Sequence, residues 1–237
     1  MMERIHKQLK FWRKEIRPVL VKSTGSKAFS VGGDQKYGYL RPLEISKWVS
    51  LLASLVATYP APYVALMDGM MMGAGCGTSV HGQFRVATER TVLAMPEVFI
   101  GHFPDVCASY FLPRLPGKLC HLLGLTGHRF EGYQVMDAGL ATHYCHSTSL
   151  PDLQRILVNC AGTSSLDFEA VLEEHTQFKG SCSGHMMSLN LEDVNACFSA
   201  AAVEDIRLDL ERADDSWARE ARARMAASLP TSLKLAK

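Results

Sequence analysis

The fold is decided by the stretch Tyr63–Met95, which reads YVALMDGMMMGAGCGTSVHGQFRVATERTVLAM. Three short apolar runs, each bounded by turn residues, predict buried strands at Tyr63–Met67, Phe84–Ala87 and Thr91–Met95. Between the first two runs, Gly73 opens a segment of small residues that we expect to continue as a helix to Gly82. The order strand, glycine loop, helix, strand predicts an α/β fold with crossover connections.

Amphipathic helices are expected on both sides of this stretch. Apolar residues recur at helical spacing in Met2–Arg17 and in Leu43–Tyr59, which precede it. Further helices are expected after it, at Lys118–Leu125, Tyr133–Ala138, Leu150–Cys160 and Val203–Met225. We therefore divide the chain into a mixed α/β core, residues 1–147, and a helical C-terminal region, residues 148–237.

Shorter segments complete the prediction. Val19–Val21 is a candidate strand, and Ala28–Asp34 is expected to be a glycine-containing loop. Ser149–Asp152 has the spacing of a capping box with a proline in the first turn, which is typical of a helix start. Ala161–Ser165 and Lys179–Met187 are small, polar and glycine-containing, so we interpret them as linkers.

The composition is that of an ordinary globular protein. The chain has 237 residues, of which 47% are hydrophobic and 21% are charged, and its formal net charge is +1. This balance gives no electrostatic reason to expect direct contact with nucleic acid or with an anionic membrane surface. No apolar run is long enough to span a bilayer, and the N-terminus lacks the continuous apolar stretch of a signal peptide.

Metal and disulfide chemistry are not expected. The seven cysteines include no C-x-x-C pair, and the nine histidines form neither H-x-x-x-H nor H-E-x-x-H. Thiols in a reducing compartment explain the cysteines best. The serine hydrolase pattern G-x-S-x-G is also missing, and the two-residue spacing of Ser79 and His81 argues against a catalytic dyad.

Two glycine loops and two acids could carry chemistry. Val31-Gly32-Gly33 and Gly73-Ala74-Gly75 each follow a strand, where glycines let backbone N–H groups approach a ligand. Taken singly, each loop is better explained by a tight turn than by a site, but a pair could supply the two donors that stabilise an oxyanion. Glu97 and Asp105 lie among apolar residues on backbone that Pro104 and other helix breakers keep irregular. Burial there would raise the pKa of both carboxyl groups, although exposed loop acids fit the sequence equally well.

Together these residues resemble a known family. The matching segments run in order along nearly the whole chain, at Lys27–Asp34, Met67–Glu89, Ala94–Glu97, Ile100–Asp105, Tyr110–Arg114, Leu125–Gly127, Ala138–His143, Cys197–Ser199 and Pro230–Lys234. They resemble the 3-hydroxyisobutyryl-CoA hydrolase branch of the enoyl-CoA hydratase/isomerase, or crotonase, superfamily. The resemblance implies a crotonase-like α/β spiral of β-β-α units with a helical C-terminal region.

The resemblance also assigns roles to individual residues. It implies that the backbone N–H groups of Val31 and Ala74 bind the thioester carbonyl oxygen. Glu97 would be the nucleophile or general base in thioester cleavage, and Asp105 would orient the substrate. The remaining substrate-binding residues expected from it are Gly32, Gly33, Asp34, Gly73 and His102. No metal or redox cofactor is expected, because coenzyme A is part of the substrate.

The chain departs from the family pattern at several positions near these residues. Ala74 replaces a glycine, Val49 stands where a substrate-contacting glutamate is usual, and His102 replaces a leucine. Cys107-Ala108-Ser109 replaces a run of glycines. Relative to the family, we expect the chain to lack the strands before its first helix and to stop within its last helix.

The implied function is hydrolysis of a small hydroxyacyl-CoA thioester, 3-hydroxyisobutyryl-CoA in valine breakdown. The alternatives are a non-catalytic structural protein, like a hydrolase-like component of some mitochondrial small ribosomal subunits, and an enoyl-CoA hydratase or isomerase. Retention of Glu97 and Asp105 favours the hydrolase. The expected partners are an acyl-CoA substrate and, as an option, further copies of the chain. The resemblance implies a mitochondrial location, with any transit peptide lying in the part that precedes this chain.

Overall fold

The strands form two sheets, and the first six strands alternate between them. The computed structural model describes residues 1–34, 36, 40–160, 164–178 and 190–237. The first sheet has the order β1-β3-β5-β8-β9, and the second has the order β2-β4-β6-β7. Because β1, β3 and β5 enter the first sheet and β2, β4 and β6 enter the second, this part of the chain winds as a spiral.

The first sheet is largely parallel. It consists of β1 (Val19–Lys22), β3 (Tyr63–Met67), β5 (Phe84–Ala87), β8 (His143–Tyr144) and β9 (Gln177–Phe178). Only β9, at one edge, pairs antiparallel with its neighbour among the described strands. All five residues of β3 are buried, as expected of a central parallel strand covered on both faces.

The second sheet is shorter and lies nearer the candidate site residues. It consists of β2 (Ala28–Ser30), β4 (Met70–Met72), β6 (Val92–Ala94) and β7 (Phe130–Glu131). The strands β2, β4 and β6 are parallel, and β7 pairs antiparallel with β6. The pairing of β2 with β4 shifts register between Ala28 and Ser30, which marks a bulge before the first glycine loop.

A helical segment follows each of the first three strand pairs. Helix α3 (Pro42–Ala57) follows β1 and β2, helix α4 (Ala74–Gly77) follows β3 and β4, and the 3₁₀ helix η1 (Glu97–Ile100) follows β5 and β6. This repeat is the spiral of β-β-α units that the sequence predicted, and the prediction is confirmed. It also places Ala74 and Glu97 at equivalent points of successive turns, just beyond the second sheet.

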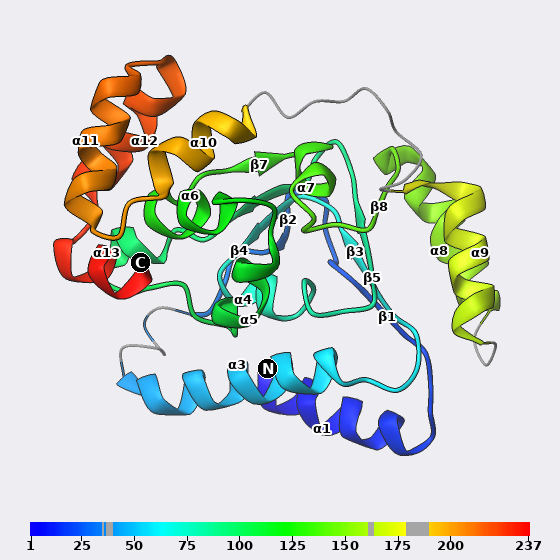
Figure 1. Cartoon of the computed structure of the whole chain (residues 1–237). Helices are drawn as coiled ribbons and strands as arrows, with labels where there is room; N and C mark the ends of the chain where they lie inside the picture. Colours follow the sequence, from blue (N-terminus) through cyan, green and yellow to red (C-terminus); the bar gives the residue numbers. More distant parts are fainter. Residues whose placement is uncertain (35, 37–39, 161–163, 179–189) are drawn as a thin grey trace.

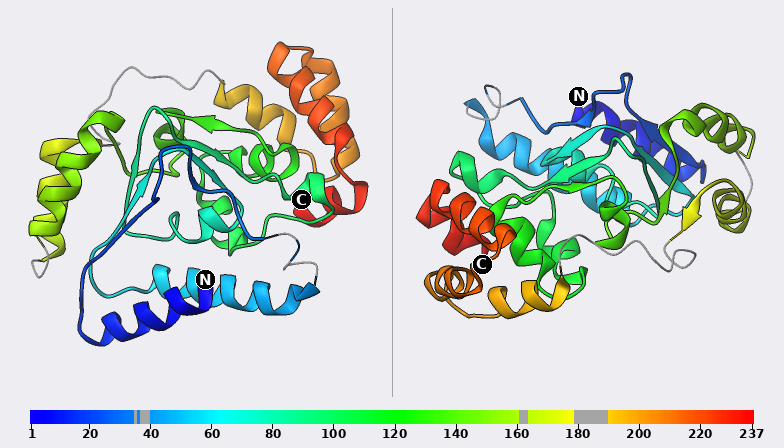
Figure 2. Two further views of the ribbon diagram at one scale, coloured as in Figure 1. Left: turned by 180° about the vertical axis from the view of Figure 1, so that it is seen from behind. Right: turned by 90° about the horizontal axis from the view of Figure 1, so that it is seen from above.

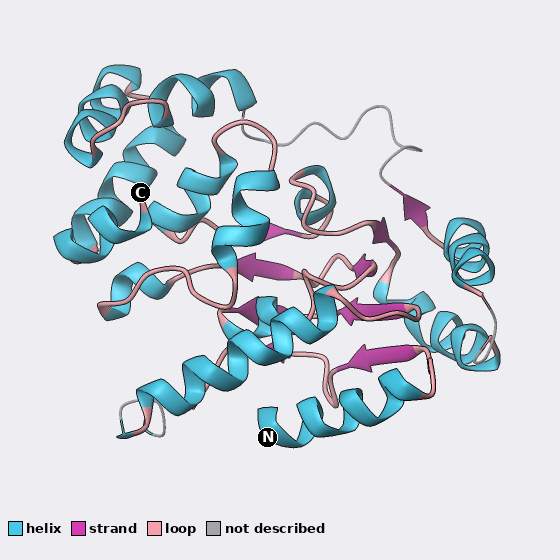
Figure 3. Ribbon diagram, turned by 60° about the horizontal axis from the view of Figure 1, so that its bottom comes forward, coloured by secondary structure: helices cyan, strands magenta, loops and turns pink. Residues whose placement is uncertain are grey.

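The other helices surround the sheets. They are α1 (Met2–Lys14), α5 (Ala108–Phe111), α6 (Leu119–Thr126), α7 (Gln134–Asp137), α8 (Leu150–Asn159), α9 (Ser165–His175), α10 (Leu191–Phe198), α11 (Val203–Ala213), α12 (Ser216–Ala227) and α13 (Pro230–Ala236), with 3₁₀ turns η2 (Leu112–Arg114) and η3 (Ser147–Ser149). Helices α1 and α3 lie side by side on one flank of the strands (Figure 1, Figure 3). The pair α8 and α9 lies at one end of the molecule, and α10–α13 lie at the opposite end (Figure 1, Figure 2).

Among the described residues, the apolar core falls into three clusters. The largest joins β4 and β6 to α6 and to the C-terminal helices, through side chains such as Met71, Leu93, Leu123, Phe198 and Ile206. A second cluster packs α8 and α9 on the first sheet, and a third packs α1 and α3 on β1 and β3. The division at residues 147 and 148 stays a prediction.

One predicted helix is interrupted. Val203–Met225 is not one helix, because α11 ends at Ala213 and Asp214 adopts a left-handed conformation with φ +48° before α12 begins. Aspartate tolerates this conformation better than most residues, so it can end a helix within a segment whose polar pattern continues unbroken. The helix start predicted at Ser149–Asp152 is confirmed, because α8 begins at Leu150 with a proline in its first turn. Ser149 makes no capping hydrogen bond there, whereas a complete capping box joins Ser164 and Asp167 at the start of α9.

Other boundaries also differ. Ala28–Ser30 is a strand and not part of a loop, and the helix expected from Gly73 to Gly82 ends at Gly77 and continues as turns. Helix α1 ends at Lys14, before the predicted Arg17. Most of the linker prediction falls on residues 161–163 and 179–189, which lie outside the described residues.

Candidate active site

The two glycine loops touch each other. A β-carbon on Gly32 would lie 3.5 Å from the carbonyl oxygen of Met72 and 3.9 Å from the amide nitrogen of Ala74. Both Gly32 (φ +101°) and Gly73 (φ +51°) adopt backbone conformations that side chains disfavour. The loops meet because β2 and β4, which lead into them, are neighbours in the second sheet.

The start of α4 lies directly against the end of β2. A β-carbon on Gly75 would lie 2.3 Å from the carbonyl oxygen of Ser30, so only glycine allows this approach. Gly73 is the residue before the first turn of α4, and its carbonyl oxygen accepts the N–H groups of Cys76 and Gly77. The N–H of Ala74 is at the first helical position, so it has no acceptor within the helix.

Glu97 lies under the second loop. Its side chain is 5% exposed, and one carboxyl oxygen, Oε1, lies 3.0 Å from where a β-carbon on Gly73 would stand. Within the described part of the chain, no hydrogen-bond partner reaches the other oxygen, Oε2. Burial, reinforced by the negative charge of Asp105, raises the pKa of Glu97 to about 8. The carboxyl group is therefore mostly protonated at pH 7.

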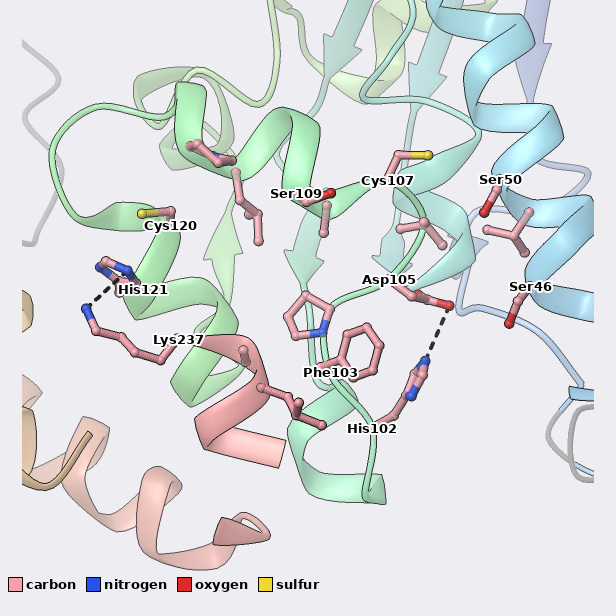
Figure 4. A pocket seen from close by; sticks show the side chains of 18 residues that line it. Ser46, Ser50, His102, Phe103, Asp105, Cys107, Ser109, Cys120, His121 and Lys237 are labelled. Carbon is pink, nitrogen blue, oxygen red and sulfur yellow. Dashed lines mark hydrogen bonds and ion pairs between the residues drawn. The ribbon is translucent and has the colours of Figure 1, made fainter. Parts of the chain in front are cut away.

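Asp105 lines a cavity next to Glu97. The cavity has a volume of about 580 Å³ and lies between α3, the segment 102–109, α6 and α13. Ser46 and Ser50 of α3 lie on one side of it, and Asp105 and His102 lie across from them (Figure 4). Nε2 of His102 is 3.7 Å from Oδ2 of Asp105. Burial raises the pKa of Asp105, and the charge of His102 opposes that rise.

The prediction that apolar surroundings raise the pKa of both acids is confirmed. The structure separates them in one respect, because Asp105 lines the 580 Å³ cavity whereas Glu97 does not. Glu97 instead lies against the second glycine loop, and the charge of Asp105 contributes to its raised pKa.

The remaining predicted residues lie around the first glycine loop. Gly32 and Ala74 line a cavity of about 500 Å³ beneath α1. Gly33 and Asp34 line a different cavity of about 380 Å³, between α1 and α3. Val31 is 59% exposed. The structure thus gathers Gly32, Gly73, Ala74 and Glu97 closely, and it places Gly33 and Asp34 further out, toward the helices.

Sequence reasoning missed two residues that touch this region. The Cys76 thiol is fully buried, and burial together with the charge of Glu97 raises its pKa well above the usual value. The ring of His81 contacts the backbone beside Asp105, with Nε2 3.0 Å from the carbonyl oxygen of Val106. Ser79 instead donates to the Gly75 carbonyl oxygen, so Ser79 and His81 serve different partners. The only sequence signal was their place in the segment after the second glycine loop.

The described residues contain neither a metal-binding cluster nor a helix that could span a membrane. No group of three or more histidine, cysteine or acidic side chains with metal-binding geometry occurs in the described ranges. No helix in these ranges is both long enough and apolar enough to cross a bilayer. The six cysteines within them are free thiols.

Relatives of known name match the chain over almost its full length. The chain is 40% identical over 246 residues to "3-hydroxyisobutyryl-CoA hydrolase, mitochondrial" of Gallus gallus and 41% identical over 246 residues to the protein of the same name in Rattus norvegicus. The protein of that name in Homo sapiens is 40% identical over 248 residues. Each match covers 99% of this chain and 64% of the relative, so the chain spans about two thirds of the length of these proteins.

Solved structures share the fold. A carnitinyl-CoA dehydratase from Mycobacterium thermoresistibile matches with a TM-score of 0.86 and 30% identity, over 99% of this chain and 69% of that one. An enoyl-CoA hydratase from Rhodobacter sphaeroides 2.4.1 matches with a TM-score of 0.80 and 26% identity, over 98% and 68%. A sequence model described as enoyl-CoA hydratase/isomerase covers residues 1–237. With the crotonase fold and the sequence in agreement, this chain belongs to the enoyl-CoA hydratase/isomerase family.

Proposed function

We propose that the protein hydrolyses a small hydroxyacyl-CoA thioester, 3-hydroxyisobutyryl-CoA, to 3-hydroxyisobutyrate and CoA, as in valine catabolism. The observation that carries the proposal is the contact between Glu97 and the second glycine loop, where Oε1 lies 3.0 Å from the β-carbon position of Gly73. A thioester bound to that loop would present its carbonyl carbon to this carboxyl group. The relatives at about 40% identity, which carry the name of such a hydrolase, support it.

The glycine loops would bind the carbonyl oxygen. In the proposed arrangement, the N–H groups of Val31 and Ala74 donate to this oxygen and stabilise the negative charge that it gains during cleavage. Each such donor is typically worth about 3–4 kcal/mol of transition-state stabilisation. The proximity of Gly32 to Ala74 supports a shared site for the two loops.

Glu97 would act as the nucleophile or general base. As a general base, its ionised form would remove a proton from water, the water oxygen would attack the carbonyl carbon, and the CoA thiolate would leave. As a nucleophile, it would attack the carbonyl carbon itself, expel the CoA thiolate and form a mixed anhydride that water then hydrolyses. A carboxyl group with a pKa of about 8 holds its proton more tightly than an ordinary glutamate, so its ionised form is the stronger base. In the general-base route, the protonated Glu97 can then give its proton to the leaving sulfur.

Asp105 and the cavity beside it would receive the acyl group. The cavity wall offers hydroxyl groups from Ser46, Ser50 and Ser109 as well as the Asp105–His102 pair. Such a lining suits an acyl chain that carries a hydroxyl group, because buried polar substrate atoms need hydrogen-bond partners. Gly33 and Asp34 would lie along the path of the CoA moiety.

The remaining features of the proposal follow from the reaction and from the relatives. Thioester hydrolysis by a carboxyl group requires no redox cofactor or metal, and the acyl-CoA is the proposed small-molecule partner. The relatives are named mitochondrial, which supports a mitochondrial location for this protein. Assembly with further copies of the chain stays part of the proposal.

A direct assay tests the function. The full chain is incubated with 3-hydroxyisobutyryl-CoA, and released CoA thiol is measured with a disulfide chromogen, after subtraction of the signal from the protein's own cysteines. We expect release by the unaltered chain and a loss of about 10²–10⁴-fold in Glu97→Gln, the usual range for removal of a general base. Circular dichroism establishes that both proteins are folded.

The same assay separates the alternatives. If the unaltered chain and Glu97→Gln are both folded and release no CoA, the hydrolase proposal is wrong and a non-catalytic role gains support. If the chain instead hydrates or isomerises a crotonyl-type thioester without releasing CoA, the hydratase or isomerase alternative replaces it.

A further inference from the structure

The two residues that follow Asp105 have an unusual backbone conformation. Val106 (φ +50°) and Cys107 (φ +62°) both adopt left-handed conformations. This conformation is a true outlier for a β-branched residue such as valine, and it persists only where the surroundings enforce it. Something must therefore hold the turn that sets the direction of the Asp105 side chain.

His81 supplies one of the contacts that hold this turn. Its Nε2 lies 3.0 Å from the carbonyl oxygen of Val106, and a carbonyl oxygen can only accept, so Nε2 carries the proton. The ring packs against Tyr110 and Phe111, with centroids 6.0 and 5.6 Å away. Burial, together with the charge of Arg85, lowers the pKa of His81 and keeps the ring neutral at pH 7.

The turn is fixed from its other side by Gly77. A β-carbon on Gly77 would lie 2.8 Å from the Cβ of Val106, so the valine side chain packs directly on the glycine. Val106 itself is almost completely buried. The amide of Ala108 donates to the carbonyl oxygen of Asp105 across the turn, at 2.7 Å. These contacts together hold the strained turn. The loss of one of them should therefore let the backbone after Asp105 relax.

We propose that His81 is a positioning residue for Asp105, acting through its hydrogen bond to the Val106 carbonyl oxygen. The inference rests on the proposed function only in assigning Asp105 to substrate binding; the geometry of the turn is independent of it. In this arrangement, the segment after the second glycine loop holds in place the acid that the chain carries 24 residues further along.

The pKa of Glu97 depends on the position of Asp105. The charge of Asp105 contributes to the raised pKa of Glu97, after burial as the larger cause. The titratable groups that interact with these acids include the Cys76 thiol, the Cys107 thiol and the His102 ring, and Cys120, His121 and Lys237 line the same cavity as Asp105. If the turn relaxes and Asp105 moves away, the pKa of Glu97 should fall, with the other groups unchanged.

Two substitutions of His81 test the role. In His81→Phe the hydrogen bond is lost while the ring packing is kept, and in His81→Gln the amide nitrogen can replace Nε2 as donor. We expect kcat/KM to fall about 10²-fold in the phenylalanine variant, the scale of a 1 Å misplacement. The glutamine variant should recover most of it. His81→Asn, which is polar but too short to reach Val106, serves as the donor-deficient variant if the phenylalanine variant does not fold.

A measurement without turnover separates this proposal from the function. The carboxyl carbon of Glu97 is followed by ¹³C NMR across the pH range, with its signal assigned by its loss in Glu97→Gln. We expect the titration midpoint to move to lower pH in the donor-deficient variant and to return in His81→Gln. This readout applies even if the protein hydrolyses no thioester.

His143→Gln is the matched control. His143 is also buried, and burial and Arg85 also lower its pKa, to about 4, but its Nδ1 bonds Thr142 Oγ1 and not the turn. We expect it to lower the melting temperature without moving the Glu97 midpoint. A donor-deficient His81 variant whose midpoint does not move, or a glutamine variant as impaired as phenylalanine, overturns the proposal.

Discussion

Oε1 of Glu97 lies 3.0 Å from the position that a β-carbon on Gly73 would occupy. The contact brings a buried carboxyl group against the backbone that leads into Ala74. Two constraints therefore favour glycine at position 73. Its φ of +51° disfavours a side chain, and Glu97 occupies the space that a β-carbon would need. The predictions below follow from this packing.

Gly73→Ala should impair both stability and hydrolysis. The added methyl group must be accommodated against Glu97 on a backbone that disfavours it, at a cost of about 1–3 kcal/mol. Denaturant unfolding measures the stability, and CoA release measures activity. Gly25→Ala is the control, because a β-carbon there would meet nothing within 4 Å. Equal stability and activity in the two variants would contradict the prediction.

The rate of hydrolysis should rise with pH. If Glu97 acts as a base or nucleophile, only its ionised form is active, and its pKa of about 8 places half of the free protein in that form at about pH 8. We expect kcat/KM to increase from pH 6 and to level off above the midpoint. A profile that is flat over this range, or that falls, would remove Glu97 from the role of base.

Glu97 should make the fold less stable as pH rises, and Glu97→Gln should remove this contribution. The pKa of Glu97 is about 8 in the folded protein and close to the ordinary value of 4.5 when unfolded. Between these values the folded state binds more protons, so the free energy of unfolding decreases with increasing pH. The change should amount to a few kcal/mol, on the order of the shift in pKa. Urea unfolding of the unaltered chain and of Glu97→Gln at pH 5 and pH 9 measures it as the difference between the two proteins. This comparison cancels the opposite contribution of the histidines whose pKa values burial lowers. Asp34→Asn is the control and should behave as the unaltered chain does.

Ala74 offers a test of the proposed oxyanion donor. Ala74→Pro removes the backbone N–H at the first position of α4, where proline is tolerated by a helix. Hydrolysis should therefore fall by about 10²–10³-fold while the fold is kept. Ala74→Gly keeps the N–H and should remain active. If the proline variant folds and hydrolyses as well as the glycine variant, this N–H is not a donor to the substrate.

The sequence predicts the strands of the spiral well where the apolar runs are long, as in Tyr63–Met67. It misses β2 and β4, which have three residues each, and β7, β8 and β9, which have two each, because strands this short have no periodicity to detect. The break between α11 and α12 depends on a single left-handed residue, Asp214, within a continuous polar pattern. The local sequence pattern therefore predicts elements that have a long apolar or amphipathic run. It fails for short strands and helix ends, whose positions depend on tertiary contacts.

In the candidate site, too, the sequence predicted local properties but not contacts between distant residues. The apolar neighbours of Glu97 and Asp105 were enough to predict that their pKa values rise. That Asp105 lines a cavity from which Glu97 is absent could not be predicted, because it depends on how α3, α6 and α13 meet the segment 102–109. The contact of His81 with Val106 joins residues 25 positions apart, which no spacing rule links.

The register shift between β2 and β4 has a consequence for how the first glycine loop is encoded. Side chains and amides alternate along a strand, so the extra residue between Ala28 and Ser30 decides which way the following peptides face. Removal of one residue from β2 would leave the loop sequence from Val31 to Asp34 unchanged. It would nevertheless reverse the direction in which the backbone N–H groups of that loop point. The loop is thus specified by a residue count upstream of it as much as by its own glycines.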